Sequence, residues 1–170
     1  MPPIVSLTCI AIGVVNDFGK AVFKNVSEAP NSFNSVNTRD KTAGAESNRE
    51  KAEMLFHYLV EQFTYVYPPK SRGAVDFLRD KKGDCGEYSF LYAALCRSLR
   101  IPCRTIVGSW SAGKMQAHVW NEVYVDGGWL PVDASMAFIQ KKKKLQFMMS
   151  DVKTLPWQKY FGHTEGQRII

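Results

Sequence analysis

The sequence predicts an α+β fold in which helices come first along the chain and an antiparallel sheet follows. Residues 47–63 and 85–99 carry apolar side chains at helical spacing. Residues 118–125 instead alternate and are rich in β-forming residues. The hairpin signal Asp126-Gly127-Gly128 then leads into a returning strand over residues 129–133. Helices followed by strands are typical of the α+β class.

Length and composition are those of one globular domain. The chain has 170 residues, 45% of them hydrophobic, which is enough for a substantial core. The formal net charge is +6, and four lysines at 141–144 supply much of the excess. We expect this run to be a solvated loop and expect no nucleic-acid partner, because nucleic-acid surfaces interleave basic with aromatic residues. Salt-dependent binding through these lysines is kept as an alternative.

The first part of the chain is read as an N-terminal arm over residues 1–46, partly loop, ahead of a core over residues 47–170. The apolar run at 4–15 could be a strand or a helical turn, and it is too short to span a bilayer. Residues 27–48 have the composition of a long loop. We expect a protein with no membrane span, cytoplasmic by default, or secreted or periplasmic if a signal segment has been removed.

The first well-defined helix is predicted over residues 47–63. Ser47 and Glu50 have the spacing of a capping box. One face is apolar and consists of Ala52, Leu55, Phe56, Leu59 and Phe63. A shorter helix is expected near residues 74–80, and Arg104 begins a strand that runs to residue 110.

Cys85 stands at the start of the most strongly patterned helix. Gly83 interrupts the preceding segment, Asp84 is suited to be the N-cap, and Pro102 stops the helix after Leu99. Unpaired N–H groups and the macrodipole at a helix start favour the thiolate form of a cysteine. The sequence therefore predicts a nucleophilic Cys85.

Two further residues complete a nucleophile, base and orienting group. His118 begins the predicted strand at 118–125, and Asp133 ends its hairpin partner. Pairing Val125 with Trp129 would put Asp133 opposite Asn121, roughly 10 Å along the strand from His118. Two side chains only just span that distance, so we expect a bulge or a bend.

The four cysteines suggest neither a disulfide framework nor a clear metal site. Cys9, Cys85, Cys96 and Cys103 contain no CxxC pair. A zinc site from Cys85, Cys96, Cys103 and His118 is kept as an alternative, although the spacing is irregular. We expect Cys96 and Cys103 to be small buried side chains. There is also no calcium-loop pattern, so no metal or cofactor is expected.

Four blocks of sequence together resemble the transglutaminase-like superfamily. They are Gly-Asp-Cys-Gly-Glu-Tyr at 83–88, Arg-Ile-Pro-Cys-Arg at 100–104, His-Val-Trp-Asn-Glu-Val-Tyr at 118–124 and Gly-Gly-Trp-Leu-Pro-Val-Asp at 127–133. The similarity extends weakly to Tyr160-Phe161-Gly162 and Gln167-Arg168-Ile169, which resemble the tail of bacterial members. Four blocks in this order and spacing are far more specific than any one alone.

The resemblance implies a papain-like, transglutaminase-core fold, with the nucleophile's helix packed on an antiparallel sheet. It implies Cys85 as nucleophile, His118 as general base and then acid, and Asp133 as the group that orients the imidazole. The substrate would be a peptide or protein, and hydrolysis of a peptide or amide bond is preferred. Glutamine transamidation or deamidation, or a binding domain without turnover, are the alternatives. The oligomeric state is left open.

Two features around the triad are left as alternatives. A side-chain donor for the oxyanion is expected by analogy with cysteine proteases, and Gln62, Tyr65 and Tyr67 are the candidates. Trp120 and Trp129 either wall the cleft, as the family's tryptophan near the histidine does, or fill the core between sheet and helix. His57 is expected to lie at the surface, and His163 is expected to be structural or exposed.

Overall fold

The computed structural model describes residues 12–16, 20–24, 38–69, 73–110, 117–142 and 155–168. The chain divides into two compact units, Met1–Val36 and Asn37–Ile170. In the first unit, β1 (Ile12–Asn16) and β2 (Lys20–Lys24) pair antiparallel. The apolar run therefore contributes to a strand, and the rest of it lies outside the described residues. The boundary between an arm over residues 1–46 and a core over residues 47–170 stays a prediction.

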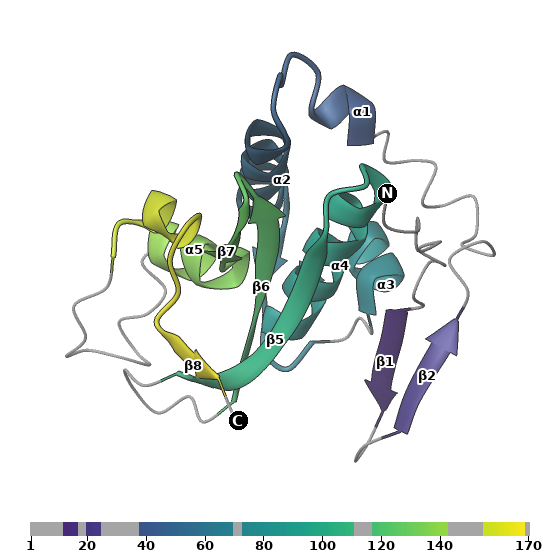
Figure 1. Cartoon of the computed structure of the whole chain (residues 1–170). Helices are drawn as coiled ribbons and strands as arrows, with labels where there is room; N and C mark the ends of the chain where they lie inside the picture. The colour runs from purple at the N-terminus through teal and green to yellow at the C-terminus, as the bar shows by residue number, and fades with distance from the viewer. Residues whose placement is uncertain are drawn as a thin grey trace. The chain divides into compact units, whose positions relative to one another are not determined.

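The second unit is an α+β structure, as predicted (Figure 1). Its main sheet has the order β7-β6-β5-β8 and is antiparallel throughout, and a separate two-stranded sheet pairs β3 (Thr64–Tyr65) in parallel with β4 (Lys82–Gly83). The strands of the main sheet are β5 (Cys103–Trp110), β6 (His118–Val125), β7 (Gly128–Val132) and β8 (Gly166–Arg168). The helices are α1 (Thr38–Lys41), α2 (Asn48–Gln62), α3 (Gly73–Asp80), α4 (Cys85–Ser98), α5 (Ala134–Lys141) and the 3-10 helix η3 (Trp157–Tyr160). α4 packs against β5 and β6, and α2 and α5 pack against α4.

The predicted capping box starts α2. The Ser47 hydroxyl accepts from the Glu50 N–H at 3.1 Å, and the Glu50 carboxylate accepts from the Ser47 N–H at 3.2 Å. Two of the four orphan donors at the helix start are thereby satisfied. The buried face is the predicted one and consists of Ala52, Leu55, Phe56 and Leu59 together with Val60. Phe63 follows the helix and is also buried.

Cys85 is the first residue of α4, and Asp84 is its N-cap, as predicted. The Asp84 carboxylate accepts from the Gly86 N–H at 2.8 Å, while Glu87 returns the bond by accepting from the Asp84 N–H at 3.1 Å. Packing also requires glycine at position 83, because a Cβ there would stand 2.6 Å from the Glu87 side chain and 2.8 Å from Phe77. The tightly packed start of α4 fixes where the thiol lies.

The hairpin between β6 and β7 differs from the predicted pairing by one residue. Val125 pairs with Gly128, because the turn has only two residues, Asp126 and Gly127, at φ 53° and 78°. Two consecutive positive φ angles are the mark of a type I′ turn. Asn121 consequently pairs with Val132.

The corrected register changes which side chains share a face. Asp133 follows Val132, so it comes opposite Trp120 and not Asn121. Side chains alternate along a strand, which puts Asp133 on the same side as Trp120 and His118. A bulge is therefore not needed to bring the acid to the imidazole.

Three elements of the second half, α5, η3 and β8, have no counterpart in the sequence prediction. α5 includes Lys141, whose ammonium pairs with Glu61 and lies 4.7 Å from the centre of the Trp157 ring. The prediction of a solvated loop is thus wrong for Lys141, and residues 143–144 lie outside the described residues. β8 adds a fourth strand beside β5 and is tied to β6 by an ion pair between Arg168 and Glu122.

Candidate functional site

The structure brings Cys85, His118 and Asp133 together from three elements. Cys85 opens α4, His118 opens β6, and Asp133 follows β7. The thiol is half-buried and not in a disulfide, and it lies close enough to His118 to help raise the pKa of the imidazole. The Nε2 atom of His118 lies 2.6 Å from Oδ2 of Asp133. The other ring nitrogen, Nδ1, is enclosed from solvent and is the one that can face the thiol.

The imidazole of His118 is fully enclosed in protein, with a side-chain exposure of 0%. Burial by itself lowers the pKa of an imidazole. For His118 the charge of Asp133, the hydrogen bond to Asp133 and the interaction with Cys85 outweigh burial and raise the pKa to about 10. The surroundings therefore favour a proton on this ring at neutral pH.

Asp133 is held by more groups than the sequence revealed. It is the N-cap of α5, and its Oδ1 accepts from the Ser135 hydroxyl at 2.9 Å and from the Met136 N–H at 3.1 Å. The Thr164 hydroxyl donates to Oδ2 at 3.4 Å. One oxygen thus caps a helix while the other meets the imidazole. The N-cap spacing of Asp133 and Ser135 was a sequence signal for α5, whereas Thr164 comes from the distant tail and had none.

Trp120 packs on His118 from the same strand. The two rings are nearly parallel, with an interplanar angle of 20° and centroids 5.9 Å apart. Two glycines leave space for the indole, because a Cβ at Gly108 or Gly166 would stand 2.5 Å or 2.7 Å from its ring. Trp120 is 2% exposed, which supports the packing role that the sequence left open.

Trp129 fits neither of its two predicted roles. It is 42% exposed on β7, where the guanidinium of Arg104 lies 4.0 Å from its ring centre and Tyr124 meets it edge to face. It therefore belongs to a polar and aromatic cluster on the sheet, neither in the core nor in contact with His118.

Of the three oxyanion candidates, Tyr65 is the one whose strand pairs with the segment that leads into Cys85. β3 (Thr64–Tyr65) pairs in parallel with β4 (Lys82–Gly83), which puts Tyr65 beside Gly83. Burial raises the pKa of Tyr65, and the charges of Cys85 and Asp84 raise it further. Gln62 is exposed at the end of α2, and Tyr67 is 76% exposed.

The zinc alternative is not supported by the geometry. Cys96 lies eleven residues after Cys85 on the same helix, or about 16 Å along its axis. Cys96 and Cys103 are buried, as predicted. Within the described ranges, no group of three or more His, Cys, Asp or Glu side chains could hold a metal ion. Over the same ranges, no helix is both long and apolar enough to cross a membrane.

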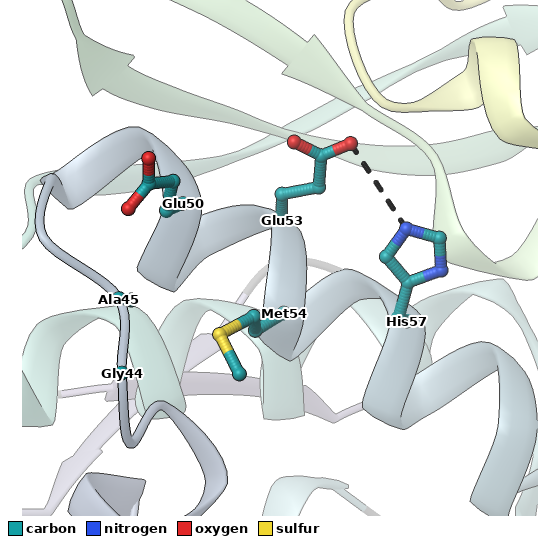
Figure 2. Close-up of a pocket in the computed structure, with 6 residues that line it drawn as sticks. All are labelled: Gly44, Ala45, Glu50, Glu53, Met54 and His57. Carbon is teal, nitrogen blue, oxygen red and sulfur yellow. Dashed lines mark ion pairs between the residues drawn. The ribbon is translucent and has the colours of Figure 1, made fainter.

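A pocket of about 320 Å³ lies away from the thiol, on the outer side of α2 (Figure 2). Its lining includes Glu53, Met54 and His57, and the His57 ring points toward Glu53 at 4.0 Å. His57 is accessible, as predicted, and His163 is exposed, which is one of its two expected states. This pocket contains none of the three residues that meet at the start of α4.

Comparison with known proteins agrees with this architecture. A model of the transglutaminase-like superfamily matches residues 37–134. The mouse kyphoscoliosis peptidase is 27% identical over 106 residues, which cover 54% of this chain and 16% of the mouse protein. Its human counterpart is 32% identical over 69 residues, or 35% of this chain and 10% of that protein. The chain thus spans less than a fifth of these relatives.

Solved structures share the fold. A candidate cysteine protease from Cytophaga hutchinsonii is 24% identical with a TM-score of 0.55, covering 58% of this chain and 35% of that one. The periplasmic domain of TgpA from Pseudomonas aeruginosa is also 24% identical, with a TM-score of 0.52, covering 62% and 43%. Since the family match extends over more than half of the chain, this protein belongs to the transglutaminase-like superfamily.

Proposed function

We propose that this protein is a cysteine-dependent acyl-transfer enzyme that hydrolyses a peptide or amide bond, with Cys85, His118 and Asp133 as its catalytic triad. The observation that carries the proposal is the 2.6 Å contact between two fully buried side chains, His118 and Asp133, beside a half-buried thiol. A buried charge pair is costly unless it is well satisfied. A buried charge pair next to a thiol at a helix start is the arrangement expected of a catalytic site.

In the first half of the reaction, the Cys85 sulfur attacks the substrate carbonyl carbon, and the carbonyl electrons move onto oxygen. The tetrahedral intermediate then collapses, the carbon–nitrogen bond breaks, and the leaving amine takes a proton from His118. In the second half, His118 removes a proton from water, which attacks the thioester. The carbon–sulfur bond then breaks, the acid leaves, and the Cys85 thiolate is restored beside the protonated imidazole. An amine in place of water would give transamidation by the same route.

Asp133 keeps the imidazole in the orientation that both halves require. Its Oδ2 accepts from Nε2, so Nδ1 is the nitrogen that exchanges a proton with Cys85 or with water. Because Oδ1 is fixed by Ser135 and the start of α5, the carboxylate cannot rotate without losing these bonds. Asp133 therefore orients the base at little entropic cost.

Tyr65 and the backbone N–H of Cys85 are the proposed oxyanion donors. The raised pKa of Tyr65 keeps its hydroxyl protonated at neutral pH, so it can donate to a developing oxyanion. A Tyr65→Phe variant should lose about 10- to 1000-fold in kcat. Alkylation of Cys85 by iodoacetamide, which develops no oxyanion, should change little in the same variant.

Hydrolysis and transamidation are separated by mass spectrometry. A pool of glutamine-containing peptides is incubated with the protein and a primary amine, and Cys85→Ala serves as the control. Cleavage or deamidation that depends on Cys85 supports the proposal. Amine adducts that depend on Cys85 would instead make the protein a transferase. Products that persist in Cys85→Ala would refute the assignment of the nucleophile.

Thiol reactivity tests the triad without a known substrate. At neutral pH, iodoacetamide should alkylate Cys85 faster than an exposed reference thiol of a model peptide, and His118→Ala should slow the reaction. Cys96 and Cys103 are buried and serve as internal controls that stay unmodified in the folded protein. Equal rates for Cys85 and the reference thiol would refute activation by His118.

A further inference from the structure

One apolar side chain of the central sheet is exposed without an evident structural reason. Val107 is 58% exposed although it lies within β5, between β6 and β8. Its partner across the strands is Val119, which is half-buried and directly follows His118. The two valines form a small apolar surface next to the proposed catalytic histidine.

The packing of α4 indicates where these valines lie relative to the thiol. The Asn121 amide donates to the Ser89 carbonyl at 3.0 Å, so Asn121 faces α4 at Ser89. Val119 lies two residues earlier on the same face of β6, about 7 Å along the strand. Cys85 lies four residues before Ser89, about 6 Å along the helix. If the step from Asn121 to Val119 along β6 runs in the same direction as the step from Ser89 to Cys85 along α4, Val119 lies beside Cys85.

The far end of α4 fixes that direction. Near the end of the helix, the Cys96 side chain interacts with that of Cys103, which pairs with Val123 on β6. The Arg97 guanidinium also donates to the Cys103 carbonyl at 2.8 Å and 3.0 Å. The end of α4 therefore lies near Val123 and its start near Val119. Val107 pairs with Val119 and therefore also lies toward the start of α4.

An exposed aromatic ring lies on the other side of the thiol. Tyr67 follows β3 two residues after Tyr65 and is 76% exposed. The β3–β4 pairing keeps this segment next to Gly83, and the Val66 N–H donates to the Gly83 carbonyl at 2.9 Å. Because Tyr65 pairs with Gly83, two residues before Cys85, Tyr67 lies on the segment that runs past the start of α4.

We propose that Val107, Val119 and Tyr67 form an apolar subsite beside Cys85, which binds a large apolar or aromatic side chain of a peptide within two residues of the reacting carbonyl. The proposal rests on the proposed function, because it assigns substrate preference to that same site. Isolated apolar residues at a surface are ordinary. Three of them around the start of one helix, beside its thiol, form a surface that a substrate side chain can cover.

Peptidyl chloromethyl ketones test the subsite directly. The Cys85 sulfur displaces chloride from the methylene carbon, so labelling needs no turnover. The probes differ in one residue, which is either adjacent to the ketone or two positions before it. This residue is leucine, phenylalanine, aspartate or lysine. We expect the leucine or phenylalanine probe to label Cys85 at least about tenfold faster than the aspartate probe. Each rate is divided by the iodoacetamide rate of the same protein.

Substitution at Val107 should change this preference and nothing else. Val107→Asp should reduce the advantage of apolar probes at least about tenfold and favour the lysine probe, and Val107→Thr should give a smaller loss. Iodoacetamide labelling should stay within twofold of the parent. Tyr124→Asp is the matched control, since Tyr124 is 41% exposed on β6 but about 20 Å along the strand from His118.

The outcomes separate this proposal from the proposed function. Equal rates for apolar and charged probes, or a preference that Val107→Asp leaves unchanged, would refute the subsite even if Cys85 is reactive. A loss of preference in Tyr124→Asp as large as in Val107→Asp would also refute it. Slow iodoacetamide labelling of Cys85 in the parent would count against the proposed function alone.

Discussion

A single methyl group added at Gly108 should disturb both the sheet and the proposed catalytic histidine. The Cβ of an alanine there would stand 2.5 Å from Cη2 of Trp120 and would collide with the backbone carbonyl oxygen of Gln167 on β8. Such distances do not occur in folded proteins, so something must move. Trp120 is enclosed and stacked on His118, and the carbonyl belongs to the sheet. Neither neighbour is a flexible side chain that can turn away.

The expected loss in the free energy of unfolding follows from these two collisions. Overpacking a well-filled site costs about 1–3 kcal/mol. Displacing β8 weakens backbone hydrogen bonds worth about 1 kcal/mol each. For Gly108→Ala we therefore expect the free energy of unfolding to fall by about 3–4 kcal/mol. Since small domains have only about 5–15 kcal/mol of stability, the loss is easily measured.

Urea unfolding followed by circular dichroism measures this loss. Gly128→Ala is the matched control, because a Cβ there meets nothing within 4 Å. We expect the control to lie within about 0.5 kcal/mol of the parent. Because Trp120 packs on His118, iodoacetamide labelling of Cys85 should also be slower in Gly108→Ala under folding conditions. A Gly108→Ala protein as stable as Gly128→Ala would refute the close packing around Trp120.

Three further predictions concern the triad and a helix cap. Asp133→Asn should lower kcat by up to about 10⁴-fold. The amide oxygen can still cap α5, but the amide favours the wrong tautomer of the His118 ring. An unchanged kcat would remove Asp133 from the triad. The pKa of His118 is about 10 in the folded chain and about 6.5 when unfolded, so its contribution to stability is complete below pH 6.5 and is lost as the pH rises through 10. Unfolding measured from pH 6.5 to 9 should show this decline in the parent and a flatter profile in His118→Gln; parallel profiles would contradict the pairing. Ser47→Ala should cost about 1 kcal/mol in urea unfolding through its cap on α2, and an unchanged midpoint would show that the cap adds nothing.

Local patterns predicted the elements whose ends are set by neighbouring residues. The caps at Ser47 and Asp84 are chosen by side chains within three positions, so the starts of α2 and α4 could be read from the sequence. The position of His118 at the head of β6 followed from strict alternation. The fold class followed from the order of helices and strands, and the family followed from the four motif blocks; the match to the family agrees with both.

Prediction failed where one residue of register or a distant segment decided the outcome. Gly127 and Gly128 are adjacent and either could end the turn, so the sequence alone left the pairing of Val125 ambiguous by one position. That one position decides whether Asp133 shares a face with His118. The support of Asp133 by Thr164, and of Trp120 by Gly166, comes from residues more than thirty positions away or from the tail. Contacts of this kind leave no local pattern.

The arrangement of the two helix starts explains why the imidazole can carry a proton while fully buried. Cys85 opens α4 and Asp133 caps α5, so each partner of His118 lies at the positive end of a helix. A helix start favours negative charge, which stabilises a thiolate on one side of the ring and a carboxylate on the other. A protonated imidazole between them then forms two favourable pairs that offset its desolvation. The same backbone that fixes the positions of the three groups therefore also favours their charged forms, and an ordinary exposed thiol elsewhere on the chain would have neither advantage.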